Sequence, residues 1–85
     1  MIIHTTSKFR KAYKKMPEIV KNKAEEKERI FIKNPFDKRL DTHKLHGKYR
    51  DYQAFTVVGQ YRIMFIFVNS DTVDFLNIGT HEIYK

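Results

Sequence analysis

Three histidines and one arginine are the residues of this chain best suited to chemistry. His43, His46 and His81 fall outside the expected strand interiors, and Arg62 begins an apolar run. Histidine titrates near neutral pH, so it can give or take a proton, and arginine can bind two phosphate oxygens at once. An arginine beside one or two histidines suits phosphodiester cleavage in RNA, because that reaction needs a base, an acid and a cation for the transition state.

Arg62 stands alone in its part of the sequence. It is the only Lys or Arg between positions 51 and 84, and it precedes Ile63–Val68, which we interpret as a strand buried on both faces. An unpaired buried charge is costly, so we expect the guanidinium to meet an anion. A purely structural alternative is that Arg62 pairs with Asp74 or Asp51 and that His81 caps the end of a strand.

The sequence predicts neither a metal site nor a cofactor. The chain has no cysteine, which excludes disulfides and thiolate ligands and is typical of a reducing compartment. The pair His43 and His46 has the spacing HxxH, which is weak evidence without a nearby acidic cluster. His4 falls in the first expected strand, where we expect a structural role.

The first half of the chain predicts one strand and two helices. Met1–Thr6 is prone to β structure, and Ser7 can cap the helix that follows. Apolar residues at 9, 12, 13 and 16 then form one helical face. Pro17 separates this helix from a second one that extends to about Lys33, where Asn34-Pro35 ends it.

The second half predicts a polar loop and three strands. The loop covers Pro35–Tyr49, and strands follow at about 52–58, 61–68 and 72–78. We therefore expect an α+β fold with the order β-α-α-β-β-β, in which a twisted, mostly antiparallel four-stranded sheet carries both helices on one face. Residues 1–85 form one domain. Because adjacent antiparallel strands run in opposite directions, the end of the last strand brings His81 close to Arg62.

The charge pattern favours a polyanionic partner. The net charge is +7, and residues 8–15 contain five basic side chains and no acidic one. Residues 33–50 contain six basic residues against two acids. The pattern suits nucleic acid or ribonucleoprotein, although a solvated basic face without a specific partner is the alternative. No secretory signal or membrane span is visible, so we expect a soluble cytoplasmic protein.

Three segments resemble the RelE/ParE superfamily of toxins, and in particular its RelE branch with YafQ-like members. The segment from Asn34-Pro35-Phe36 to Leu40–Lys48 resembles the loop before the sheet of these toxins. Tyr61-Arg62-Ile63-Met64-Phe65 resembles their second-hairpin strand, and Ile78–Tyr84 resembles their C-terminal motif. With the N-terminal strand and helices, the resemblance covers essentially the whole chain. In the YafQ-like branch, a further histidine often stands where this chain has Phe55.

The resemblance implies a toxin of a type II toxin–antitoxin module that cleaves mRNA in the ribosomal A site without a metal. It assigns the scissile phosphate to Arg62, and the acid and base roles to His81 and His43. Tyr84 would orient the phosphate or stack on a base. The expected partners are a cognate antitoxin, the ribosome and mRNA. The implied RNA-binding residues are those of the first helix and the loop: Lys8, Lys11, Lys15, Lys44, His46, Lys48 and Arg50.

Two other functions are compatible with the same sequence. The ParE branch of the superfamily poisons DNA gyrase without enzymatic activity, and a basic RNA-binding domain need not be toxic at all. Fold alone does not separate these functions, because function resides in the site. The set of Arg62, His81 and His43 favours the nuclease, since gyrase binding does not need it.

Overall fold

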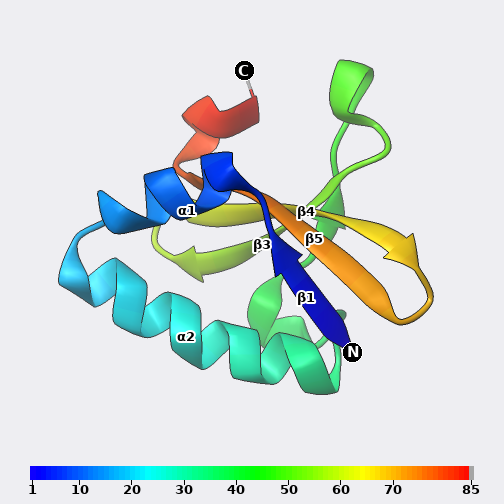
Figure 1. The fold of residues 1–85 in the computed structure, drawn as a ribbon, viewed down its shortest axis with the longest axis horizontal. Helices are drawn as coiled ribbons and strands as arrows, with labels where there is room; N and C mark the ends of the chain where they lie inside the picture. The colour runs from blue at the N-terminus through cyan, green and yellow to red at the C-terminus, as the bar shows by residue number, and fades with distance from the viewer. Residues whose placement is uncertain (85) are drawn as a thin grey trace.

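A five-stranded mixed sheet forms the centre of the computed structural model, which describes residues 1–84 and the side chains of residues 1–83 (Figure 1). The strand order is β1-β5-β4-β3-β2. Strand β1 pairs with β5 in parallel, and the other three pairs are antiparallel. The strands are β1 (Ile2–Thr5), β2 (His43–Lys44), β3 (Gln53–Val58), β4 (Tyr61–Asn69) and β5 (Thr72–Gly79).

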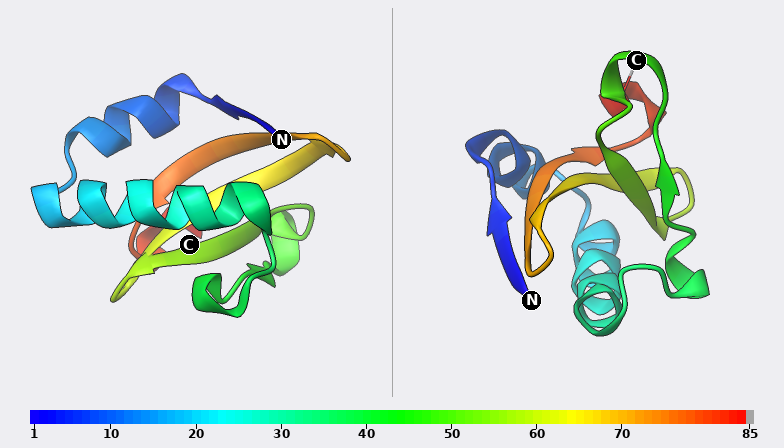
Figure 2. Two further views of the ribbon diagram at one scale, coloured as in Figure 1. Left: turned by 90° about the horizontal axis from the view of Figure 1, so that it is seen from below. Right: turned by 90° about the vertical axis from the view of Figure 1, so that its right-hand side faces the viewer.

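Two helices cover one face of this sheet, as the sequence predicts (Figure 2). Helix α1 (Ser7–Lys14) packs against β5, and α2 (Glu18–Lys33) packs against β3. Three short 3₁₀ turns complete the chain: η1 (Lys38–Leu40), η2 (Gly47–Tyr49) and η3 (His81–Tyr84). The predicted α+β class and the predicted packing of both helices on one face are confirmed.

The cap of α1 differs from the predicted one by a single residue. Thr6, rather than Ser7, is the N-cap, and its hydroxyl oxygen accepts a hydrogen bond from the Phe9 amide at 3.0 Å. The same hydroxyl donates to the carbonyl of Leu76 at 3.1 Å. The second bond favours Thr6 as the N-cap, because it also ties the start of the helix to β5.

Aromatic rings fill the layer between α2 and the sheet. Phe31 on α2 is fully buried, and its ring lies 4.9 Å from the rings of Phe55 and Phe65 and 5.5 Å from that of Phe75. These three phenylalanines come from the adjacent strands β3, β4 and β5. Burying a phenylalanine stabilises a protein by roughly 1.5–3 kcal/mol, so this cluster contributes much of the folding free energy.

The opposite face of the sheet, here called the open face, carries no helix. A small second cluster lies on it, with Leu45, Ala54 and Met64 buried. The prediction that Ile63–Val68 is buried on both faces is therefore wrong for its second half. Ile63, Met64 and Phe65 are buried, whereas Val68 is exposed because the open face is uncovered at that end.

The predicted four-stranded sheet gains a fifth strand from the polar loop. His43 and Lys44 pair with Ala54 and Gln53 of β3 and form the short edge strand β2. This pairing was not predicted, because the segment has neither the length nor the alternation of an ordinary strand.

Two leucines hold the loop on either side of the sheet. Leu40 is fully buried in the cluster on the helix side, and Leu45 is buried on the open face. The chain therefore passes around the edge of β3 between these two anchors. This crossing carries the following residues from the helix side to the open face.

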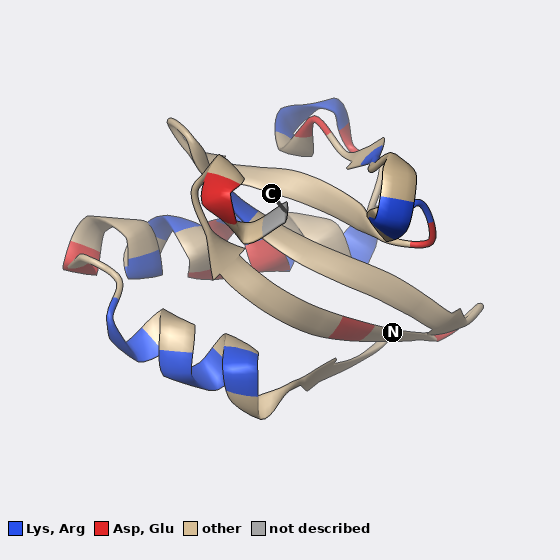
Figure 3. Cartoon of the chain, turned by 90° about the horizontal axis from the view of Figure 1, so that it is seen from above, with Lys and Arg blue, Asp and Glu red and all other residues tan. Residues whose placement is uncertain are grey.

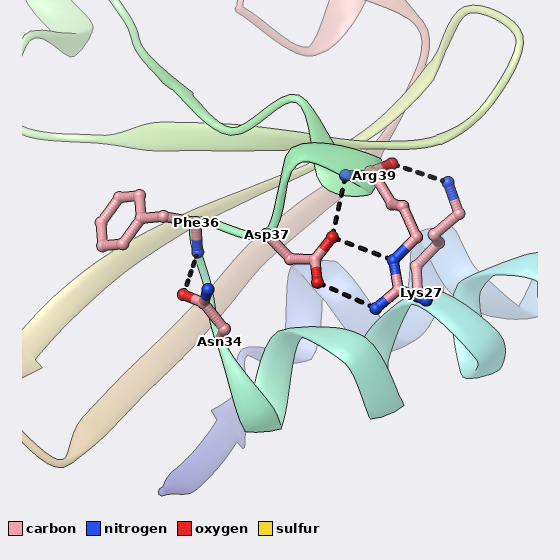
Figure 4. Close-up of polar contacts among 5 residues, drawn as sticks. All are labelled: Lys27, Asn34, Phe36, Asp37 and Arg39. Atoms are coloured by element: carbon pink, nitrogen blue, oxygen red, sulfur yellow. Dashed lines mark hydrogen bonds and ion pairs between the residues drawn. The ribbon is translucent and has the colours of Figure 1, made fainter.

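The start of the loop is fastened by polar contacts at the end of α2 (Figure 4). The Asp37 carboxylate accepts from both Nε and Nη2 of Arg39, at 2.9 and 2.8 Å, and from the Arg39 amide. These bonds hold the pKa of Asp37 well below its usual range, with the side-chain bond from Arg39 as the largest cause. Lys27 on α2 donates to the Arg39 carbonyl at 3.2 Å. The loop therefore enters its crossing from a fixed position.

Within the described residues, neither helix combines the length and apolar composition needed to cross a lipid bilayer.

Replacing Thr6 tests the observed cap. We expect Thr6→Ala to lower the free energy of unfolding by about 1–2 kcal/mol, because it removes the cap and the bond to β5. Ser7→Ala is the matched control and should change it by less than about 0.5 kcal/mol. Urea denaturation measures both values, and equal losses in the two variants would contradict the assignment.

Candidate active site on the open face

Strand pairing sets the layout of the open face as two neighbouring rows. Side chains alternate along a strand, and directly paired residues share a face. One row crosses the sheet from β2 to β5 and contains His43, Ala54, Met64 and Asn77. The next row contains Thr56, Arg62 and Gly79. Neighbouring rows on one face are two residues apart, or about 7 Å along the strand.

All three predicted histidines line one pocket at the edge of this face. The pocket has a volume of about 320 Å³. Its walls come from β2, from the loop that follows it and from the first residue of η3, and consist of His43, Lys44, Leu45, His46, Tyr49 and His81. The three histidines are exposed to solvent. The structure thus joins side chains that are up to 38 positions apart in sequence, from His43 to His81.

The local contact of His43 fixes its tautomer. Its Nδ1 lies 3.0 Å from the carbonyl oxygen of Asp41. A carbonyl oxygen only accepts, so the proton of the neutral ring is on Nδ1, and the lone pair is on Nε2. Asp41 itself adopts a left-handed backbone conformation with φ of 50°, which turns the chain directly before β2. His43 is thereby held as a potential proton acceptor.

Arg62 lies in the row next to the pocket, at the start of β4. Its Cα pairs with that of Gly79, two residues before His81, so the predicted proximity of the strand ends is confirmed at the level of the backbone. The side chain is not among those that line the histidine pocket. The structure therefore pairs the strand ends in the predicted register, while the guanidinium points back to the turn between β3 and β4 and lies outside the pocket lining.

The guanidinium of Arg62 is held by backbone carbonyls and only partly satisfied. Its Nη1 donates to the carbonyl oxygens of Gly59, at 2.7 Å, and Tyr61, at 3.1 Å. Its Nε is buried and has no hydrogen-bond partner. Buried polar groups without a partner are rare and call for an explanation.

The structural alternative for Arg62 is not supported by the ion pairs of the described residues. Asp74 lies 3.8 Å from His4, and Asp71 lies 3.6 Å from the N-terminal amine. None of the ion pairs found among the described side chains involves Arg62. The pairing of Arg62 with Asp74 or Asp51 is therefore not seen among the described side chains.

A glycine allows the C-terminal turn to lie against this face. A Cβ atom at Gly79 would lie 2.6 Å from Cγ2 of Ile83, closer than real side chains pack. Ile83 belongs to the small cluster of the open face. Gly79 therefore lets η3 fold back over the end of β5 and sets the position of His81. The side chain of Tyr84, the fourth predicted catalytic residue, lies outside the described residues.

The predicted RNA-binding residues fall into two groups on different parts of the molecule (Figure 3). Lys44 and His46 line the histidine pocket, and Lys48 and Arg50 lie on the exposed turn beside it. The second group, Lys8, Lys11 and Lys15, is exposed on α1 and just after it, near the opposite edge of the sheet. The structure thus brings the first group to the histidines and keeps the second apart from them.

The structure adds two observations to the site expected from the sequence, one on Phe55 and one on Tyr49. Phe55, where the YafQ-like branch often has a histidine, is fully buried among the aromatic rings on the helix side. Its neighbours Ala54 and Thr56 are the residues of β3 that face the site. Tyr49 lines the pocket, although nothing in the sequence singled it out.

Among the described residues, no group of three His, Asp or Glu side chains is arranged to hold a metal ion.

No protein-family model matches the chain, and no curated protein matches it in sequence. Solved structures of toxins nevertheless share its fold over almost the whole chain. The YoeB/ParE toxin from Agrobacterium tumefaciens matches with a TM-score of 0.80 and 15% identity over 95% of this chain and 99% of that one.

Two solved complexes contain chains with the same fold. One is the DinJ–YafQ toxin–antitoxin complex of Escherichia coli, with a TM-score of 0.77 and 20% identity over 96% of this chain and 93% of that one. The other is the archaeal RelE–RelB complex from Pyrococcus horikoshii OT3, with a TM-score of 0.73 and 18% identity over 93% and 92%. These similarities confirm the fold expected from the resemblance.

Replacing Gly79 tests how η3 is held. We expect Gly79→Ala to displace η3, because the new methyl group collides with Ile83. The ring signals of His81 in the NMR spectrum should shift, while those of His4, on β1, stay in place. A second change, Ile83→Ala, removes the collision and should restore the original His81 signals. Unchanged His81 signals in Gly79→Ala would show that η3 is not held by this contact.

Proposed function

We propose that this protein is the toxin of a type II toxin–antitoxin module and that it cleaves mRNA in the ribosomal A site. The observation that carries the proposal is the pocket lined by three histidines, with the backbone of Arg62 in the neighbouring row of the sheet. Arg62 would bind a phosphate oxygen there once its side chain turns from the Gly59 carbonyl toward the pocket. The toxin fold of the chain supports the same conclusion.

The proposed reaction is an attack of the RNA 2′-hydroxyl on the neighbouring phosphate. His43 takes the proton of the 2′-hydroxyl on Nε2, since its Nδ1 already donates to Asp41. The new O2′–P bond forms as the P–O5′ bond breaks, and His81 gives a proton to the departing 5′-oxygen. Arg62 stabilises the negative charge that accumulates on the phosphate oxygens. The products are a 2′,3′-cyclic phosphate and a 5′-hydroxyl, and no step needs a metal.

The basic residues are proposed to bind RNA phosphates without reading sequence. Lys44, Lys48 and Arg50 lie beside the pocket, where they would contact the mRNA or nearby ribosomal RNA. The exposed lysines of α1 lie at the other edge of the sheet, so they would contact a different part of the ribosome. The ribosome is large enough to meet both groups at once.

The proposed partner in the resting state is a cognate antitoxin, and the proposed place of action is the cytoplasm. YafQ, which has the same fold, forms a toxin–antitoxin complex with DinJ. The net charge of +7 favours an acidic antitoxin. Such a partner would cover part of the basic surface and keep RNA from it.

Expression of the chain alone tests the proposed function. We expect growth arrest, with transcripts cut inside translated reading frames and with 2′,3′-cyclic phosphate at the new 3′ ends. Sequencing of RNA ends before and after induction measures both the position and the chemistry of the cuts. Arrest with DNA breaks and intact mRNA would instead support the gyrase-directed function of ParE-type toxins. Growth without arrest would support a non-toxic RNA-binding domain.

Single substitutions test the assigned residues. We expect His81→Ala and Arg62→Ala each to slow cleavage of ribosome-bound mRNA by about 10²–10³-fold, because they remove the acid and the cation of the reaction. His4→Ala and Arg29→Ala are matched controls, since His4 is on β1 and Arg29 is exposed on α2, neither lines the pocket, and both changes should leave the rate unchanged. Single-turnover cleavage measures the rates, and an unchanged rate in folded His81→Ala would remove His81 from the mechanism.

A further inference from the structure

Among the described residues that line the histidine pocket, Tyr49 is the only Phe, Tyr or Trp. It ends the turn η2 and is half-buried, so part of its ring reaches solvent. The proposed chemistry uses histidines and an arginine and gives this ring no role. A flat apolar surface beside proton-transfer groups needs an explanation of its own.

The small hydrophobic cluster on the open face holds the ring of Tyr49 in place. The ring packs against the buried residues Leu45, Ala54 and Met64. The ring of Tyr52 lies 5.9 Å away and is tilted by 38°. The amides of Tyr49 and Tyr52 donate to His46 and Tyr49 carbonyls, which closes the turn. Tyr49 therefore presents a ring of fixed orientation at little cost in entropy.

Positive charge surrounds this ring on the solvent side. The ammonium group of Lys48 lies over it, 5.1 Å from the ring centroid. Lys44 and His46 line the same pocket. Lys48 is exposed, so its ammonium can leave the ring and bind a phosphate when another flat group takes its place. An aromatic surface interleaved with cations is the arrangement with which proteins bind single-stranded nucleic acids.

We propose that Tyr49 is a stacking platform for one nucleobase of the bound RNA, next to the scissile phosphate. This inference rests on the proposed nuclease function and names a substrate subsite within the same pocket. The pocket of about 320 Å³ is at the lower end of the range of roughly 300–1,000 Å³ for small-ligand sites, which suits a single nucleotide. The backbone of Arg62 lies one row further along the sheet than that of His43, so its side chain would reach the phosphate of that nucleotide by turning toward the pocket.

Stacking has a consequence that a purely structural role of Tyr49 does not have. Every base has a flat π surface, so removal of the base alone should weaken binding, while the phosphates still contact the lysines. A tyrosine that only packs against Leu45 would not respond to the presence of the base.

The test compares two RNA trimers that differ only in their central base. Both carry 2′-O-methyl groups, which prevent attack of the 2′-oxygen, and one has adenine at the centre while the other is abasic there. We expect the adenine trimer to bind the unmodified protein about ten-fold more tightly, equivalent to about 1.4 kcal/mol. NMR titration measures both affinities, and the Tyr49 ring signals should move upfield with the adenine trimer.

Substitutions assign the effect to the pocket ring. Tyr49→Phe keeps the ring and should keep the ten-fold ratio, whereas Tyr49→Leu keeps apolar packing and should reduce the ratio to about one. Tyr52→Leu is the matched control, because Tyr52 belongs to the same cluster but does not line the pocket. An unchanged ratio in Tyr49→Leu, or no preference for adenine in the unmodified protein, would overturn the proposal.

The outcome is separable from that of the nuclease itself. Base-dependent binding through Tyr49 without any mRNA cleavage would support the subsite and refute the nuclease. Cleavage that depends on His81 and Arg62, with binding indifferent to the base, would support the nuclease and refute the subsite.

Discussion

The arrangement of the site depends on how Phe31 packs against three adjacent strands. Because Phe55 and Phe65 must face this helical side chain, alternation along their strands turns Ala54, Met64 and Arg62 to the opposite face. A slip of one residue in β4 would bury Arg62 among aromatic rings, at a prohibitive cost. The hydrophobic core therefore selects which side chains can meet a substrate, although it contains none of them.

Most of the fold could be predicted because its signals are local. The apolar face of α1, the break at Pro17 and the three long strands each follow from spacing within a few residues. The short strand β2 could not be predicted, since His43 and Lys44 become a strand only through pairing with β3. The cap at Thr6 was missed for a similar reason, because its second bond goes to Leu76, 70 residues away.

The candidate site was predictable where it depends on strand order. Antiparallel pairing alone brings the start of β4 beside the end of β5. It therefore correctly predicts that Arg62 lies beside Gly79, two residues before His81. The sequence could not show that the loop crosses the sheet edge between Leu40 and Leu45, and this crossing brings His43 and His46 to the same pocket as His81. The charge pattern and the resemblance assign the lysines of the α1 region to RNA binding, but neither predicts how far these lysines lie from the pocket.

The two hydrophobic clusters differ greatly in size, and the pocket belongs to the smaller one. Among the described residues, the hydrophobic cluster beneath it has three buried members, Leu45, Ala54 and Met64, whereas the cluster on the other side of the sheet has twelve. Local opening has a free energy set by the contacts that it breaks, so the loop and η3 can separate while the helices and the sheet stay intact. Substitutions in residues 45–52 and in η3 would therefore change the pocket while leaving the core between the helices and the sheet intact.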